Sequence, residues 1–238
     1  MKTIYLNIQS KGGAGKSMLT YFQALKNEEN GNSVFVDLDS STRTSSRQLI
    51  FIHERNPDRV YKVDILDQIK KIEREKLFKI FEALNAMDFT DVYVDFGAPE
   101  SEQLPRLFTI DFTLEEFKEF EISMEIKIVF NVVVAGGTAY TSTFEYLKRI
   151  TEIVKGKFDV YVYVNEFMFQ NYASQIEELK GFVKSAKGVI KGMKAFGNIQ
   201  IDRGSGQKII DNIKNGRGME SFNGFPVKII MKRELLKI

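Results

Sequence analysis

Residues 9–20 read QSKGGAGKSMLT, and this stretch constrains the architecture of the 238-residue chain more than any other. It follows an alternating β-type run and precedes a helical pattern, which is the context of a phosphate-binding loop. Glycines let backbone N–H groups approach phosphate oxygens, and the start of a helix favours an anion. The residues expected to bind nucleotide are Gly12, Gly13, Ala14, Gly15, Lys16, Ser17 and Met18.

Two lysines occur in this loop, where one is enough. Lys16 is expected to contact the β- and γ-phosphates, and the Ser17 hydroxyl to ligate Mg²⁺. The second lysine, Lys11, follows Ser10, which replaces the first glycine of the standard pattern. The form K-G-G-x-G-K-[ST] resembles the deviant Walker A motif of the ParA/MinD family of ATPases. That resemblance implies an ATP-dependent homodimer, in which Lys11 reaches the phosphates bound by the partner subunit, much like an arginine finger.

The composition excludes several kinds of site. The chain has 34 Lys and Arg against 32 Asp and Glu, so any basic surface must come from local clustering. It has no cysteine, which excludes disulfides, thiolate metal sites and iron–sulfur clusters and suits the reducing cytoplasm, where we expect the protein. We see no signal peptide and no apolar run approaching the roughly 20 residues of a membrane span.

Short β-branched and aromatic runs alternate with helical patterns along the chain, which predicts an α/β fold. We expect a doubly wound, mostly parallel twisted sheet with helices on both faces, forming a single P-loop nucleotide-binding domain over residues 1–238. The expected strands are Thr3–Gln9, Ser33–Leu38, Asp91–Asp95, Glu125–Val134, Phe158–Asn165 and Asn198–Ile201. The expected helices include Glu75–Met87, Thr138–Val154 and Ser174–Lys194.

Three carboxylates lie at the ends of expected strands, where ligands bind in open α/β sheets. Asp95 is placed to hold Mg²⁺ through water, and Gly97–Ser101 forms a loop that could switch with the nucleotide. For the D-x-D pair, the family resemblance implies that Asp39 orients or activates the attacking water and that Asp37 holds a Mg²⁺-bound water. Both could instead be turn caps.

The later part of the chain bears on nucleotide and branch. Asn165 ends a strand where relatives often have an asparagine that recognises the adenine edge. Asp202 stands where many relatives have proline, which leaves GTP open as the nucleotide. The stretches VYVDFGAPE, IKIVFNVVVAGGTAYTSTFEYLKRI and VYVYVNEF resemble TraL- and StbB-type proteins of conjugative and mobilisable plasmids. This implies a role in plasmid partition or positioning, stability or conjugative transfer, with a plasmid-encoded adaptor protein as partner.

Two surfaces could bind larger partners. One is a stripe on the expected helix Ser174–Lys194, made of Lys180, Lys184, Lys187, Lys191 and Lys194, which would hold DNA non-specifically or simply be solvated. The other is the basic amphipathic C-terminus, with Val227, Ile230, Met231, Leu235 and Ile238 on one side. It would pack against the sheet or, as the MinD-like alternative, lie on a membrane. A small-molecule ligase of the same superfamily is a third possibility.

Overall fold

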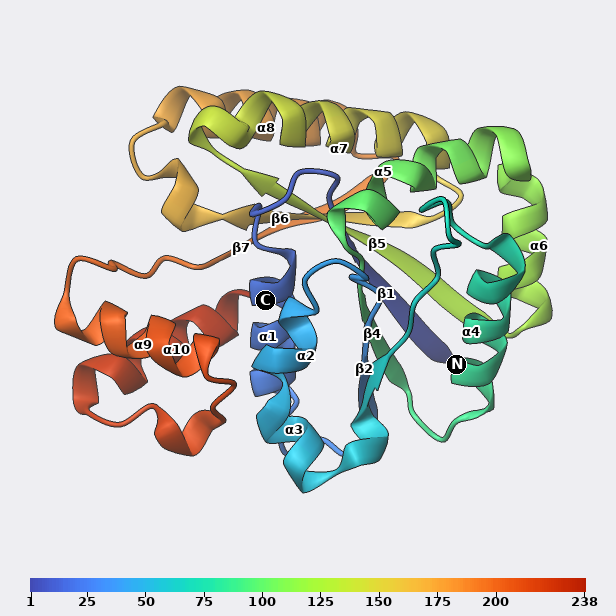
Figure 1. Cartoon of the computed structure of the whole chain (residues 1–238). Helices are drawn as coiled ribbons and strands as arrows, with labels where there is room; N and C mark the ends of the chain where they lie inside the picture. Colours follow the sequence, from blue (N-terminus) through green and yellow to red (C-terminus); the bar gives the residue numbers. More distant parts are fainter.

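Seven parallel strands form one sheet in the order β3-β2-β4-β1-β5-β6-β7 (Figure 1). The structure is a computed structural model that describes residues 1–238. The strands are β1 Lys2–Ile8, β2 Ser33–Asp37, β3 Val60–Lys62, β4 Asp91–Asp95, β5 Ile126–Ala135, β6 Asp159–Asn165 and β7 Ile190–Phe196. The predicted α/β class with a parallel sheet is confirmed.

The central strands are apolar because they are covered on both faces. In β2 every residue is buried, and successive side chains point to opposite sides of the sheet. Val34 and Val36 join one hydrophobic cluster, whereas Phe35 between them joins the other. A fully buried side chain of this size contributes about 1.5–3 kcal/mol to folding, so both layers hold the sheet in place.

Helices cover both faces of the sheet (Figure 1). One face is covered by α4 Arg74–Ala86, α5 Ala98–Arg106, α6 Leu114–Ser123, α7 Tyr140–Val154 and α8 Ala173–Ser185. The other face is covered by α1 Lys16–Lys26, α2 Thr44–Gln48, α3 Ile50–Arg55, α9 Gly204–Lys214 and α10 Phe225–Lys237. None of these helices combines the length and the apolar content that a membrane crossing needs.

The prediction of one helix over Ser174–Lys194 is wrong. Helix α8 ends at Ser185, and the last part of the predicted range belongs to β7, which pairs with β6 at the edge of the sheet. Gly188 and Gly192 interrupt the helical pattern, while Ile190 and Phe196 anchor the strand in the core. The five lysines therefore do not form a single stripe: two lie on α8, one in the turn and two on β7.

Two further differences concern short elements. Residues Asn198–Ile201 form a loop rather than a strand, because Gly197 has φ +79° and turns the chain out of the sheet. The short edge strand β3 was not predicted. At the C-terminus, α10 packs on the protein: Val227, Met231 and Ile238 are buried.

Candidate functional site

The expected site residues meet at one edge of the sheet, where the central parallel strands end. Asn7 near the end of β1 and Asp37 at the end of β2 are both in register with Asp95, the last residue of β4. A pocket of about 370 Å³ opens here. Its lining combines the loop 12–18 with Asp39, Ser41, Thr42, Thr44, Gln48 and Ala98; we call it the phosphate-loop pocket.

Glycine is needed in this loop for conformational and for steric reasons. Gly13 and Gly15 have φ +76° and +111°, a region that L side chains rarely adopt. A Cβ on Gly15 would also lie 2.7 Å from Nδ2 of Asn165. Helix α1 begins directly after this glycine, so its free N-terminal N–H groups lie beside the loop.

Lys16 arches back over the loop. Its Nζ donates a hydrogen bond to the Gln9 carbonyl oxygen at 2.9 Å, and the residue is buried. Burial lowers the pKa of Lys16, while the nearby carboxylates of Asp95, Asp39 and Glu100 oppose that shift. A buried cation with a single backbone partner is well placed to exchange that partner for phosphate oxygens.

Ser17 and Asp95 form the expected metal-binding pair. The Ser17 hydroxyl donates to Asp95 Oδ2 at 2.7 Å, and the Ser45 hydroxyl donates to the same oxygen. Oδ1 of Asp95 is buried without a partner. Burial raises the pKa of Asp95 to about 7, against the hydrogen bonds from both serines and the charge of Lys16.

This donor set fits Mg²⁺. Hydroxyl and carboxylate oxygens are the ligands it prefers, and an orphaned carboxylate oxygen has acceptor capacity to spare. No group of three or more His, Cys, Asp or Glu side chains forms a metal site. Phosphate oxygens and water would therefore have to complete the coordination, as is usual for Mg²⁺ at phosphate loops.

Asp37 and Asp39 hold the loop that follows β2. Asp37 Oδ1 accepts a hydrogen bond from the Asp39 N–H at 3.0 Å, and its Oδ2 accepts from the N–H and hydroxyl of Ser46 at 2.8 and 2.6 Å. Both oxygens of the expected water-holding carboxylate therefore have protein partners. The turn-cap interpretation describes the contacts of Asp37 in this structure.

Asp39 lines the phosphate-loop pocket, but its oxygens are also occupied. Oδ1 accepts from the N–H and hydroxyl of Ser41 at 3.0 and 2.7 Å and from the Thr42 N–H at 3.1 Å. Oδ2 accepts from the Thr42 hydroxyl. Burial raises the pKa of Asp39, but the hydrogen bonds from Thr42 and Ser41 outweigh it and hold the pKa below its usual value.

Lys11 and Asn165 have different surroundings. Lys11 is exposed and its ammonium group makes no ion pair or hydrogen bond, so it is free to reach another molecule. Asn165 Nδ2 donates to the Ala14 carbonyl oxygen at 3.0 Å, which ties β6 to the phosphate loop. Its Oδ1 is buried without a partner and remains available to a donor such as an exocyclic amine.

Sequence reasoning missed Glu100 and Gln48. Six buried side-chain polar atoms have no hydrogen-bond partner, and four of them surround this site: Gln48 Oε1, Asp95 Oδ1, Glu100 Oε2 and Asn165 Oδ1. Such atoms are rare in folded proteins, so their concentration here indicates a ligand site. Glu100 was present in the stretch VYVDFGAPE as an acidic residue in the first turn of a helix, but nothing local showed its burial.

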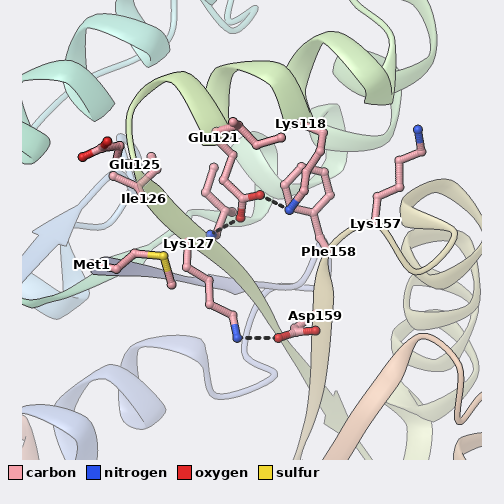
Figure 2. Close-up of a pocket in the computed structure, with 11 residues that line it drawn as sticks. Met1, Lys118, Glu121, Glu125, Ile126, Lys127, Lys157, Phe158 and Asp159 are labelled. Carbon is pink, nitrogen blue, oxygen red and sulfur yellow. Dashed lines mark hydrogen bonds and ion pairs between the residues drawn. The ribbon is translucent and has the colours of Figure 1, made fainter.

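A second pocket, of about 450 Å³, lies at the amino ends of the central strands (Figure 2). Its charges are already satisfied: Lys127 pairs with Asp159 at 2.7 Å, and Lys118 pairs with Glu121. Lys157 at its rim pairs with Glu115 on α6. It has none of the unpartnered acceptors found around the phosphate loop, so we do not assign it a ligand.

No protein-family model and no curated protein matches the chain. Solved structures resemble it at low identity. MinD in the MinC:MinD cell division complex of Aquifex aeolicus has TM-score 0.52 at 16% identity, with 99% of this chain and 95% of that chain covered. A ParA family ATPase from Chlorobium tepidum TLS has TM-score 0.51 at 12% identity, with 100% of both chains covered.

A plasmid partition protein from Borrelia burgdorferi has TM-score 0.50 at 13% identity, with 90% of this chain and 96% of that chain covered. The structural neighbours are thus ATPases of the ParA/MinD group. At these identities the likeness establishes the fold, which is that of the P-loop nucleoside triphosphatases.

Proposed function

We propose that the chain is a Mg²⁺-dependent ATPase of the ParA/MinD type, which dimerises when it binds ATP and is reset by hydrolysis. The observation that carries this proposal is the phosphate loop with its ring of unpartnered acceptors. Lys16, the Ser17–Asp95 pair and the free oxygen of Asn165 are arranged from phosphate to base side around one pocket. ParA and MinD folds in the structural neighbours support the same activity.

The chemical role of each residue follows from its position. Backbone N–H groups of the loop and Lys16 would hold the phosphates, and Ser17 with Asp95 would hold Mg²⁺, which neutralises phosphate charge when bound. The turn organised by Asp39 lines the pocket and would position the attacking water. The exposed Lys11 of a second subunit would complete the charge clamp only in the dimer.

The first test is nucleotide binding and hydrolysis by the purified chain. We expect binding of ATP with Mg²⁺, an ATP-dependent dimer in light scattering, and slow release of phosphate. Lys16→Ala should lose binding. Asp39→Ala should keep binding and slow hydrolysis by roughly 100-fold, because it removes the turn that faces the γ-phosphate. Absence of ATP binding by the wild-type chain would contradict the proposal.

The cellular role we propose is positioning, maintaining or transferring plasmid DNA, in the manner of TraL- and StbB-type proteins and with a plasmid-encoded adaptor. The structure offers a basic surface in place of the broken lysine stripe. Seven exposed cations that make no ion pair belong to α9, α10 and their adjoining loops: Arg203, Lys208, Lys214, Arg217, Lys228, Lys232 and Arg233. Such a surface would contact phosphates without reading sequence.

The alternative, a MinD-like membrane-surface switch, needs an apolar face on α10. Much of that predicted face is buried in the core. What remains outside is Phe225 and Leu236, which are 77% and 75% exposed between basic residues of the same helix. Co-sedimentation with anionic vesicles in the presence of ATP, with Phe225→Ser and Leu236→Ser as variants, separates this function from DNA binding.

A further inference from the structure

We propose that Glu100 is a catalytic residue of this ATPase, and that its free carboxylate oxygen accepts a hydrogen bond from the attacking water. The inference rests on the proposed function and adds a residue to it. It starts from an acid that the fold buries and only half satisfies. Glu100 lies in the first turn of α5, five residues after Asp95.

One oxygen of Glu100 has a clear structural role. The side chain is 0% exposed, and its Oε1 accepts hydrogen bonds from the Ser40 N–H at 3.2 Å and from the Ser40 hydroxyl. Ser40 directly follows Asp39, so this contact ties the loop after β2 to the first turn of α5. Both segments line the phosphate-loop pocket, through Asp39 and Ala98.

The other oxygen has no structural role. Oε2 is buried and makes no hydrogen bond or ion pair. Leaving a carboxylate oxygen buried without a partner costs free energy, so the fold alone gives no reason to keep a charged group here. A glutamine would make the same contact with Ser40 without that cost. An unsatisfied acceptor of this kind therefore indicates a partner that arrives with the ligand.

Gly97 brings this oxygen next to Asp39. A Cβ on Gly97 would lie 2.1 Å from Glu100 Oε2 and 3.0 Å from Asp39 Oδ1. The missing side chain thus lets the two carboxylates converge on one point beside the pocket. Of the two, Asp39 has both oxygens occupied by Ser41 and Thr42, whereas Glu100 keeps one oxygen free. The free acceptor for a water molecule is therefore Glu100.

The chemical step needs no further reactant. The oxygen of the water attacks the γ-phosphorus, and the bond from that phosphorus to the bridging oxygen of ADP breaks. By accepting one O–H of the water, Glu100 directs a lone pair of the water toward phosphorus. The proton that the water gives up ends on the released phosphate, so Glu100 is unchanged at the end of the step.

The test is Glu100→Gln, measured by single-turnover hydrolysis, nucleotide affinity and thermal unfolding. The amide keeps the carbonyl acceptor for Ser40 but puts a donor where the free oxygen was. We expect the hydrolysis rate to fall by roughly 100-fold, while the Kd for ATP stays within about threefold and Tm stays equal or rises. Two controls accompany it: Glu102→Gln, an exposed glutamate of the same helix, and Ser40→Ala, which removes one of the two donors to Oε1.

Three results would overturn the inference: wild-type hydrolysis by Glu100→Gln, a fall in Tm that accompanies its loss of activity, or the same large loss in Ser40→Ala. The last two would make Glu100 a brace for Ser40. These outcomes leave the ATPase proposal standing, because the wild-type chain still hydrolyses ATP. A wild-type chain that binds no ATP would contradict the proposed function and this inference together.

Discussion

Two glycines of the phosphate loop have backbone conformations that other residues rarely adopt, and one of them also faces a side chain. Gly15→Ala combines φ +111° with a clash against Asn165. We expect it to destabilise the fold by about 1–3 kcal/mol and to abolish ATP binding. Gly12→Ala is the matched control, because a Cβ there meets nothing within 4 Å. Equal Tm values for the two variants would contradict this reading of the loop.

Lys11 is the residue whose role depends on a second subunit. Its ammonium group has no partner within the chain, so Lys11→Ala should leave ATP binding by the monomer within about threefold of wild type. The same variant should lose the ATP-dependent dimer, which light scattering or analytical ultracentrifugation would measure. Lys79→Ala, an exposed lysine on α4, serves as control. An unchanged dimer would remove the proposed action in trans.

At the scale of elements, α10 is fastened to the loops on the base side of the site. Glu234 Oε2 accepts from the N–H groups of Gly197 and Asn198 at 2.7 and 3.2 Å, and Lys237 bridges Glu234 and Glu166. Glu234→Ala leaves the buried donor unpaired and should cost about 2 kcal/mol, or about 4–8 °C in Tm. Weaker nucleotide binding should accompany this loss, since the loop flanks Asn165.

A second tie joins the end of α1 to the segment before α10. Glu28 accepts from the Met219 N–H at 2.8 Å, and burial raises its pKa, against that hydrogen bond and the ion pair with Arg55. A carboxyl with a raised pKa binds its proton more tightly in the folded state. Its contribution to stability therefore falls as pH rises from about 4.5 upward. Glu28→Gln should flatten this fall, as urea unfolding across pH 4–7 would measure.

Sequence patterns located the elements that meet at the site better than those at the edge of the sheet. Asp95 and Asn165 could be placed because a strand and the polar residue that ends it are adjacent in sequence. The edge strand β7 was mistaken for helix because its lysines continue the spacing of α8. Glu100 was missed for a different reason: its burial depends on Ser40, 60 residues earlier in the chain.

At the scale of the whole molecule, charge is distributed unevenly although the net charge is only +2. We expect ATP-dependent binding to arbitrary duplex DNA that weakens steeply with salt. Replacing Lys228, Lys232 and Arg233 by alanine should weaken binding and lower the salt slope by about one per lost phosphate contact. The matched control replaces Lys180, Lys184 and Lys187, which belong to the α8 side of the sheet. A larger effect of the control would return DNA to the α8 surface.

The position of β1 in the middle of the sheet also has a consequence for how the chain folds. The first strand to leave the ribosome pairs with β4 and β5, which are synthesised about 90 and 125 residues later. Until then its backbone donors and acceptors and its apolar side chains lack their native partners. Non-local parallel pairing of this kind folds slowly, and exposed strands aggregate. We therefore expect slow refolding from denaturant, with yields that improve at high dilution or with a chaperone.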